Sequence, residues 1–154
     1  MQTQRMGSRA LRVGRRFDLS PSREQVRHFL GGFCRWAADQ PDILAVALVG
    51  SYARNDATSD SDVDLIIVAF DPEIYLRDTS WAQRFGTISR QHLENYGNVT
   101  SLRVWYLGVM KSSTGFTDEA WCGFPLDEGT KKVVSGGMEV LGERGSMLTR
   151  LKWT

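Results

Sequence analysis

The fold is decided by residues 48–68, whose sequence is LVGSYARNDATSDSDVDLIIV. An apolar run over 43–49 stops at the pair Gly50-Ser51, a polar loop follows, and a second apolar run over 62–69 begins with two aspartates. This pattern predicts two buried strands, with a short helix from the serine in the loop that joins them. The loop and the two carboxylates should therefore meet at one end of a sheet.

Asp62 and Asp64 open the second predicted strand, and because side chains alternate across a strand they should point to the same face. Two carboxylates held together there repel each other and are costly to desolvate unless a cation lies between them. Oxygen ligands with no His or Cys nearby favour Mg²⁺ or Mn²⁺ over zinc, and Mg²⁺ held by carboxylates commonly binds substrate phosphates as well. The pair is therefore predicted to be a metal site that also attracts substrate phosphates.

Gly50 and Ser51 are predicted to bind phosphate groups. A glycine after a strand lets the backbone approach a ligand closely, and amides with a hydroxyl at a helix start make an anion site. Arg54, in the same loop, is either a phosphate contact or a solvated charge.

A Gly-Ser pair, ten intervening residues and Asp62-Val63-Asp64 followed by apolar residues resemble the polymerase-beta-type nucleotidyltransferase superfamily. Its stand-alone, or minimal, members and the aminoglycoside and lincosamide adenylyltransferases are the nearest resemblance. A weaker resemblance to bacterial stand-alone members runs through the tail, at Trp121, Asp127, Gly129-Thr130, Val133-Val134, Gly137 and Val140-Leu141.

That resemblance implies an α/β (α+β) nucleotidyltransferase fold, with a small mixed sheet flanked by helices. It also implies an activity, which is the transfer of a nucleoside monophosphate from a nucleoside triphosphate to a hydroxyl. AMP from Mg-ATP is the expected group, and a small molecule or a protein is the expected acceptor. By the same resemblance, Asp62 and Asp64 are expected to be the catalytic carboxylates, and the nucleotide-binding residues are expected to be Gly50, Ser51 and Arg54.

A third carboxylate is part of the resemblance, which places it where this sequence has Leu102-Arg103-Val104. No Asp or Glu occurs between Glu94 and Asp118. In the two-metal scheme that the resemblance implies, this carboxylate helps to hold the metal that activates the attacking hydroxyl. Its loss should spare nucleotide binding more than turnover.

Arg103 is expected on the same sheet face as Asp62 and Asp64, within reach of one or both carboxylates. Asp118 or Glu119, in a loop, is the alternative third ligand, although loops position ligands less well than strands.

The other elements follow from apolar spacing and from helix-breaking residues. They are a helix over 20–39 that starts at Ser20-Pro21, a helix over 79–96, a strand over 99–107, a variable loop over 111–115, a β-hairpin of 131–134 with 138–141, and a last short helix over 146–153. His92 falls on the apolar stripe of the second predicted helix and is expected to be a core histidine. Residues 17–154 are predicted to form a single domain that ends with the C-terminal hairpin and the last helix.

Composition limits the partners. Residues 1–16 carry five arginines and no acidic residue, which predicts a basic, disordered tail. The rest of the chain is acidic and has no basic stripe, which argues against a nucleic-acid substrate.

Cys34 and Cys122 share no motif spacing and are expected to be reduced core thiols of a cytoplasmic protein. No apolar run is long enough to span a membrane, so no membrane partner is expected.

Three functions therefore compete. The first is a nucleotidyltransferase, and the second is a binding module that keeps the nucleotide site but has lost most of its chemistry. The third is an antitoxin-like protein that acts by gripping a protein partner, as the resemblance to some minimal nucleotidyltransferases allows.

Overall fold

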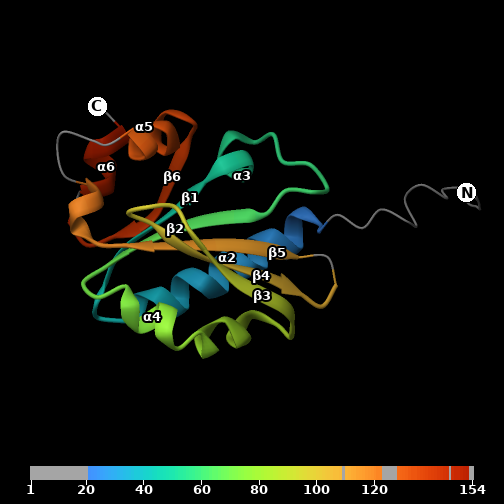
Figure 1. Ribbon diagram of the computed structural model, residues 1–154. Helices are drawn as coiled ribbons and strands as arrows, with labels where there is room; N and C mark the ends of the chain where they lie inside the picture. The colour runs from blue at the N-terminus through green and yellow to red at the C-terminus, as the bar shows by residue number, and fades with distance from the viewer. Residues whose placement is uncertain (1–20, 109, 123–127, 146, 153–154) are drawn as a thin grey trace, which may run out of the picture.

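The computed structural model of the chain describes residues 21–108, 110–122, 128–145 and 147–152. In these residues a six-stranded sheet has the order β3-β4-β5-β2-β1-β6 (Figure 1). Neighbouring strands are antiparallel except β2 and β5, which are parallel. The strands are β1 (Ile43–Val49), β2 (Val63–Ala69), β3 (Ile88–Asn95), β4 (Thr100–Tyr106), β5 (Lys111–Thr117) and β6 (Met138–Glu143).

The helices lie on both sides of this sheet (Figure 1). They are α2 (Arg23–Ala38), α3 (Gly50–Arg54), α4 (Glu73–Arg77), the 3₁₀ helices η1 (Ser80–Phe85) and η2 (Glu119–Cys122), α5 (Glu128–Ser135) and α6 (Met147–Lys152). The chain therefore has the mixed α/β fold that the sequence predicts, a mixed sheet flanked by helices.

One face of the sheet packs on α2, α4 and η1. Phe33 in α2 is fully buried there, together with alternate residues of the central strands such as Leu65 and Ile67. The helix begins one residue after Ser22, which accepts a hydrogen bond from the backbone N–H of Gln25 while the Gln25 side chain accepts one from the Ser22 N–H. The predicted helix is confirmed, but the capping hydroxyl belongs to Ser22; the predicted start at Ser20 lies outside the described residues.

The opposite face packs on α5, α6 and η2 over β1, β2 and β6. Buried Ala47, Ile66 and Val68 meet Trp121 and Leu148 in this second core. Burial on both faces explains why β1 and most of β2 are continuous apolar runs. Asp64 is an exception in the otherwise buried β2, so the sheet brings a carboxylate to the edge of this second core.

The predicted helix over 79–96 is wrong. The chain makes η1, ends it at Gly86, whose φ is 152°, and then forms the edge strand β3. Trp81 and Phe85 do pack under the sheet, as their spacing suggested, but the residues after Gly86 hydrogen-bond to β4 instead of continuing a helix. His92 therefore lies in an exposed strand and is not a core histidine, with 45% of its side chain accessible.

Residues 111–115, predicted as a loop, begin the central strand β5. Their Ser, Thr and Gly residues carry little of the apolar signal of a strand. Gly115 is required by packing, because a Cβ there would lie 2.7 Å from Val99 Cγ1 and 3.0 Å from Ile66 Cδ1. The strand is thus specified by its neighbours in the sheet, which the local sequence does not reveal.

The predicted hairpin of 131–134 with 138–141 is also wrong. Its first half is in α5, and β6 pairs with β1 at the edge of the sheet. Thr130, Val133 and Val134 follow helical spacing, and both valines pack on the second core. The strand predicted over 99–107 is confirmed as β4, and the last helix is confirmed as α6.

Several expectations fall on residues that are not described, among them the basic tail over 1–16, Asp127 and the side chain of Cys122. Cys34 is half-buried, at the margin of the core. Within the described ranges, no helix combines the length and apolarity that crossing a membrane would require.

Candidate nucleotide and metal site

The turn from β1 into α3 is built around the side chain of Asp64. Gly50, the first residue of α3, has a φ of 73°, a left-handed conformation that favours glycine. A Cβ at Gly50 would collide with the Asp64 carboxylate. Glycine is therefore needed here for the backbone conformation and for the space that the carboxylate fills, whereas the sequence suggested only an approach of the backbone to phosphates.

Asp62 and Asp64 flank Val63 at the start of β2, as predicted. Burial, and secondarily the neighbouring charge of Asp62, raises the pKa of Asp64 from 3.8 to about 6. A carboxyl group with a raised pKa has lost water without gaining an adequate partner. That is the environment in which a bound cation stabilises the ionised form.

Asp62 has partners that Asp64 lacks. Arg103 donates to it from Nε to Oδ2 at 2.8 Å and from Nη2 to Oδ1 at 3.3 Å, and Lys111 Nζ lies 3.8 Å from Oδ1. The Asp62 side chain is only 10% exposed, so this two-pronged pair is largely withdrawn from water. The predicted contact of Arg103 with the aspartate pair is confirmed, and it is made to Asp62.

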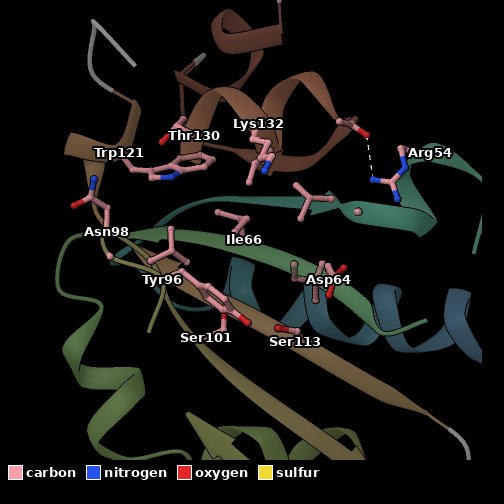
Figure 2. Close-up of a pocket in the computed structure, with 17 residues that line it drawn as sticks. Arg54, Asp64, Ile66, Tyr96, Asn98, Ser101, Ser113, Trp121, Thr130 and Lys132 are labelled. Atoms are coloured by element: carbon pink, nitrogen blue, oxygen red, sulfur yellow. Dashed lines mark hydrogen bonds between the residues drawn. The ribbon is translucent and has the colours of Figure 1, made fainter. Parts of the chain in front are cut away.

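A cavity of about 690 Å³ lies between the sheet and the α5 side of the fold. Figure 2 shows Asp64, Ser113, Ser101 and Tyr96 on the sheet side, facing Trp121 and Lys132 on the other side. Gly50 and Arg54 complete the lining at the Asp64 end. The cavity thus has a charged end, at Asp64, and an end lined by aromatic side chains.

Arg54 is held in place beside this cavity. Its Nη1 donates to the Gly136 carbonyl at 3.4 Å (Figure 2), and its Nε lies 3.2 Å from Asp56 Oδ2. Its side chain also passes close to Gly137, where a Cβ would lie 2.9 Å from Arg54 Cγ. Arg54 therefore joins α3 to the turn between α5 and β6.

The position beside the aspartates differs from the one that the sequence indicated. β5 lies between β2 and β4, and Ser113 is the residue paired with Asp64 across the parallel strands. A third carboxylate on the strand next to Asp64 would therefore stand at 113. Arg103 is paired with Ser113 from the far side, one strand further away. The sequence interpretation erred because it took 111–115 for a loop and so treated β4 as the adjacent strand.

Asp118 and Glu119 do not supply the missing ligand. Thr117 pairs with Val68, at the end of β2 opposite to Asp64. Asp118 follows five residues after Ser113, ~17 Å along an extended strand. Among the described residues, no cluster of three or more His, Cys, Asp or Glu side chains could hold a metal ion.

The structure brings together Gly50, Arg54 and Asp64 at the cavity, and Asp62 beside them. Ser51 is half-buried in α3 and does not line the cavity. Sequence reasoning missed Ser113, Lys111, Lys132 and Tyr96 as neighbours of the site. Recognising 111–117 as a strand would have placed Ser113 and Lys111 on the face of Asp64. Recognising 128–135 as a helix would have pointed to Lys132.

Comparisons with known proteins give one family match and a similar solved structure. Residues 33–105 match the family described as "Nucleotidyltransferase domain", so this part of the chain is similar to nucleotidyltransferase domains of the polymerase-beta type. No match is found among curated proteins. The solved structure of an aminoglycoside 6-adenyltransferase from Bacillus subtilis is similar, with a TM-score of 0.48 and 14% sequence identity over 64% of this chain and 36% of that one. The chain thus spans only about a third of that protein's length.

A divalent cation fits the residues present. The donors are carboxylate oxygens at the start of β2, where Asp62 directly precedes the strand and Asp64 lies in it. Asp64 is desolvated and has a raised pKa. Only two carboxylates are at hand in the described part of the chain, so a cation would need further oxygens from water or a phosphate. This donor set suits Mg²⁺ or Mn²⁺ that arrives with a nucleotide.

Proposed function

We propose that the chain binds a nucleoside triphosphate with Mg²⁺ or Mn²⁺ in the cavity above Asp64 and transfers its nucleoside monophosphate to a hydroxyl group. The observation that carries this proposal is the convergence of Gly50, Arg54 and Asp64 at one end of a cavity large enough for a nucleotide. AMP is the proposed group, because adenylyltransferases are the nearest resemblance of the motif at 50–64.

Asp62 and Asp64 would hold the cation, which when bound would neutralise phosphate charge and polarise the phosphate under attack. The Gly50 turn would lie against the phosphates. Arg54 and Lys132, which line the same cavity, would offset the remaining negative charge.

In the proposed transfer, an acceptor hydroxyl oxygen forms a bond to the α-phosphorus. The bond from that phosphorus to the oxygen bridging to the β-phosphate breaks, and pyrophosphate leaves with the electron pair. The hydroxyl proton passes to solvent. Among the described residues no third carboxylate lies next to Asp64 to receive that proton, so the chain's own contribution is positioning and charge.

One observation favours the alternative, a nucleotide-binding module with weak transfer. The Arg103 guanidinium occupies both oxygens of Asp62, and a cation must displace it or share the carboxylate with it. Binding of one cation together with a nucleotide is compatible with this contact. A second cation would have fewer carboxylate ligands than the first.

The test is a calorimetric titration of the protein with α,β-methylene-ATP in the presence of Mg²⁺. This analogue cannot be cleaved between the α- and β-phosphates. A screen for pyrophosphate release from ATP follows. We expect Asp64→Asn to weaken binding about 100-fold, the equivalent of one or two charge-assisted contacts. Asp60→Asn is the matched control, because Asp60 is exposed in the same loop. Equal affinity in wild type and Asp64→Asn would overturn the proposed site.

A further inference from the structure

A basic strip lies on the sheet face that carries Asp64. We define this strip as Arg90 and His92 of β3, Arg103 and Trp105 of β4, and Lys111 of β5. Register places Ser113 beside Asp64, Arg103 beside Ser113 and His92 beside Arg103, in one row across the four strands. The row next to it contains Trp105, paired with Lys111 on one side and with Arg90 on the other.

This part of the sheet is open. Helices α5 and α6 pack on β6 and η2, at the other edge (Figure 1). The second core that these helices form contains no residue of β3, β4 or β5. The strip is therefore a surface that begins at the aspartates and runs outward to the edge strand β3.

Trp105 fixes the two guanidinium groups of the strip. Arg90 Cζ lies 4.1 Å, and Arg103 Cζ 4.8 Å, from the centroid of the Trp105 ring. Such contacts hold a guanidinium flat and leave its N–H groups directed outward from its edge. Arg90 is exposed, and its side chain makes no hydrogen bond or ion pair to any described residue, so its donors are available to a ligand.

The acidic residue beside the strip is already occupied. Glu94 lies 3.0 Å from His92 Nε2, accepts from the Tyr96 hydroxyl at 3.0 Å and lies 4.0 Å from Arg103 Nη1. Those hydrogen bonds, chiefly that of His92, lower the pKa of Glu94 and keep it ionised. Arg90 and Lys111 are not offset by it.

The positive charge of the strip would increase once a nucleotide binds. Asp62 now neutralises Arg103 and, at longer range, Lys111. A cation held by Asp62 and Asp64 would take over that carboxylate, so the charges of Arg103 and Lys111 would no longer be offset by Asp62. Lys111 Nζ would keep its 2.9 Å hydrogen bond to the Asp60 carbonyl, which holds it at the strip. Nucleotide binding and anion binding on the strip should thus favour each other.

We infer that the strip binds the acceptor, and that the acceptor is a small hydroxyl compound carrying a phosphate group. This inference rests on the proposed function. Arg103 and Lys111 both approach Asp62, and Arg90 shares the Trp105 ring with Arg103. Such a group of cations matches a phosphate dianion better than a single carboxylate. Arg90 is three strands from Asp64, ~14 Å of backbone, so its phosphate subsite is separate from the nucleotide's. A polycationic acceptor such as an aminoglycoside would be repelled.

The experiment uses inorganic phosphate as the probe and the whole chain saturated with Mg²⁺ and α,β-methylene-ATP. Backbone amide resonances of β3 and β4 are followed by NMR during the phosphate titration. We expect saturable shifts around Arg90 and Trp105, with an affinity about tenfold lower in Arg90→Gln. Arg77→Gln is the matched control, because Arg77 is also exposed but lies on α4, on the other side of the sheet.

The outcomes separate the two proposals. If the nucleotide analogue does not bind in the first step, the proposed function fails. If it binds but phosphate then gives no saturable shifts, or shifts of equal affinity in wild type and Arg90→Gln, the acceptor inference fails alone. The same titration without nucleotide should show weaker phosphate binding, and equal or tighter binding there would contradict the coupling through Asp62.

A turnover assay adds an independent arm. Glucose 6-phosphate, glucose and glucosamine share a ring and differ in charge, so pyrophosphate release with each reports the charge preference of the acceptor site. We expect release to be greatest with the phosphorylated sugar and to fall in Arg90→Gln. Release with glucosamine that exceeds release with glucose 6-phosphate would overturn the inference.

Discussion

The substitution Asp64→Asn should stabilise the free protein and, by the same change, weaken cation binding. The pKa of Asp64 rises from 3.8 to about 6 on folding, chiefly through burial. Between these values the folded state holds the proton more tightly than the unfolded state. The stability contributed by this group is therefore fully present below about pH 4 and is lost as the pH rises through 6.

The size of the effect follows from the shift. Two pKa units correspond to about 3 kcal/mol as an upper bound, and because the carboxyl is only partly withdrawn from water we expect about 1–2 kcal/mol after screening. Asparagine has no charge to desolvate. Asp64→Asn should accordingly match wild type near pH 4 and exceed it by that amount at pH 7.

Urea unfolding of both proteins at pH 4, 5, 6 and 7 measures this difference, and Asp60→Asn controls for the removal of a carboxylate as such. In wild type, the affinity for Mg²⁺ with α,β-methylene-ATP should fall about tenfold for each pH unit below 6, since Asp64 must lose its proton to bind. A mutant no more stable than wild type at pH 7, or a stability difference that does not change with pH, would refute the assigned environment of Asp64.

Two other substitutions test the geometry of the site. Gly50→Ala should destabilise the protein by more than Gly97→Ala. Both glycines have positive φ, 73° and 80°, which alone costs alanine about 1–2 kcal/mol, but a Cβ meets the Asp64 carboxylate only at 50. Equal decreases in Tm for the two variants would refute the clash. Ser113→Asp should lower the stability of the free protein, since it adds a like charge beside Asp64. It should also increase the rise in Tm produced by Mn²⁺, and an unchanged rise would show that 113 does not face the cation.

The sequence was most informative where one short segment contained all the evidence. Gly50, Asp62 and Asp64 lie in a strand–loop–strand unit whose apolar runs and breakers are local, and the structure places them as expected. The β5 strand was missed because Ser112, Ser113 and Thr114 are polar and acquire their strand conformation from β2 and β4 on either side. The sequence predicts both of those strands, but it does not reveal that 111–117 lies between them.

The two errors in the outer elements have a related cause. Trp81, Phe85 and Ile88 have helical spacing, yet Gly86 separates a 3₁₀ turn from an edge strand within that pattern. In α5, Val133 and Val134 favour a strand by propensity, but packing on the second core decides for a helix. Tertiary contacts overrode the local preference in both segments.

The two aspartates of the motif are not equivalent, and this difference bears on how a cation would bind. Asp62 is already neutralised by Arg103, with Lys111 close by, whereas Asp64 is desolvated without a direct positive partner. A cation therefore gains most at Asp64 and must displace or share a guanidinium at Asp62. The displaced Arg103 still has Glu94 at 4.0 Å and the ring of Trp105 at 4.8 Å. Since those contacts hold it on the basic strip, occupation of the aspartates would move positive charge toward the proposed acceptor and not into solvent.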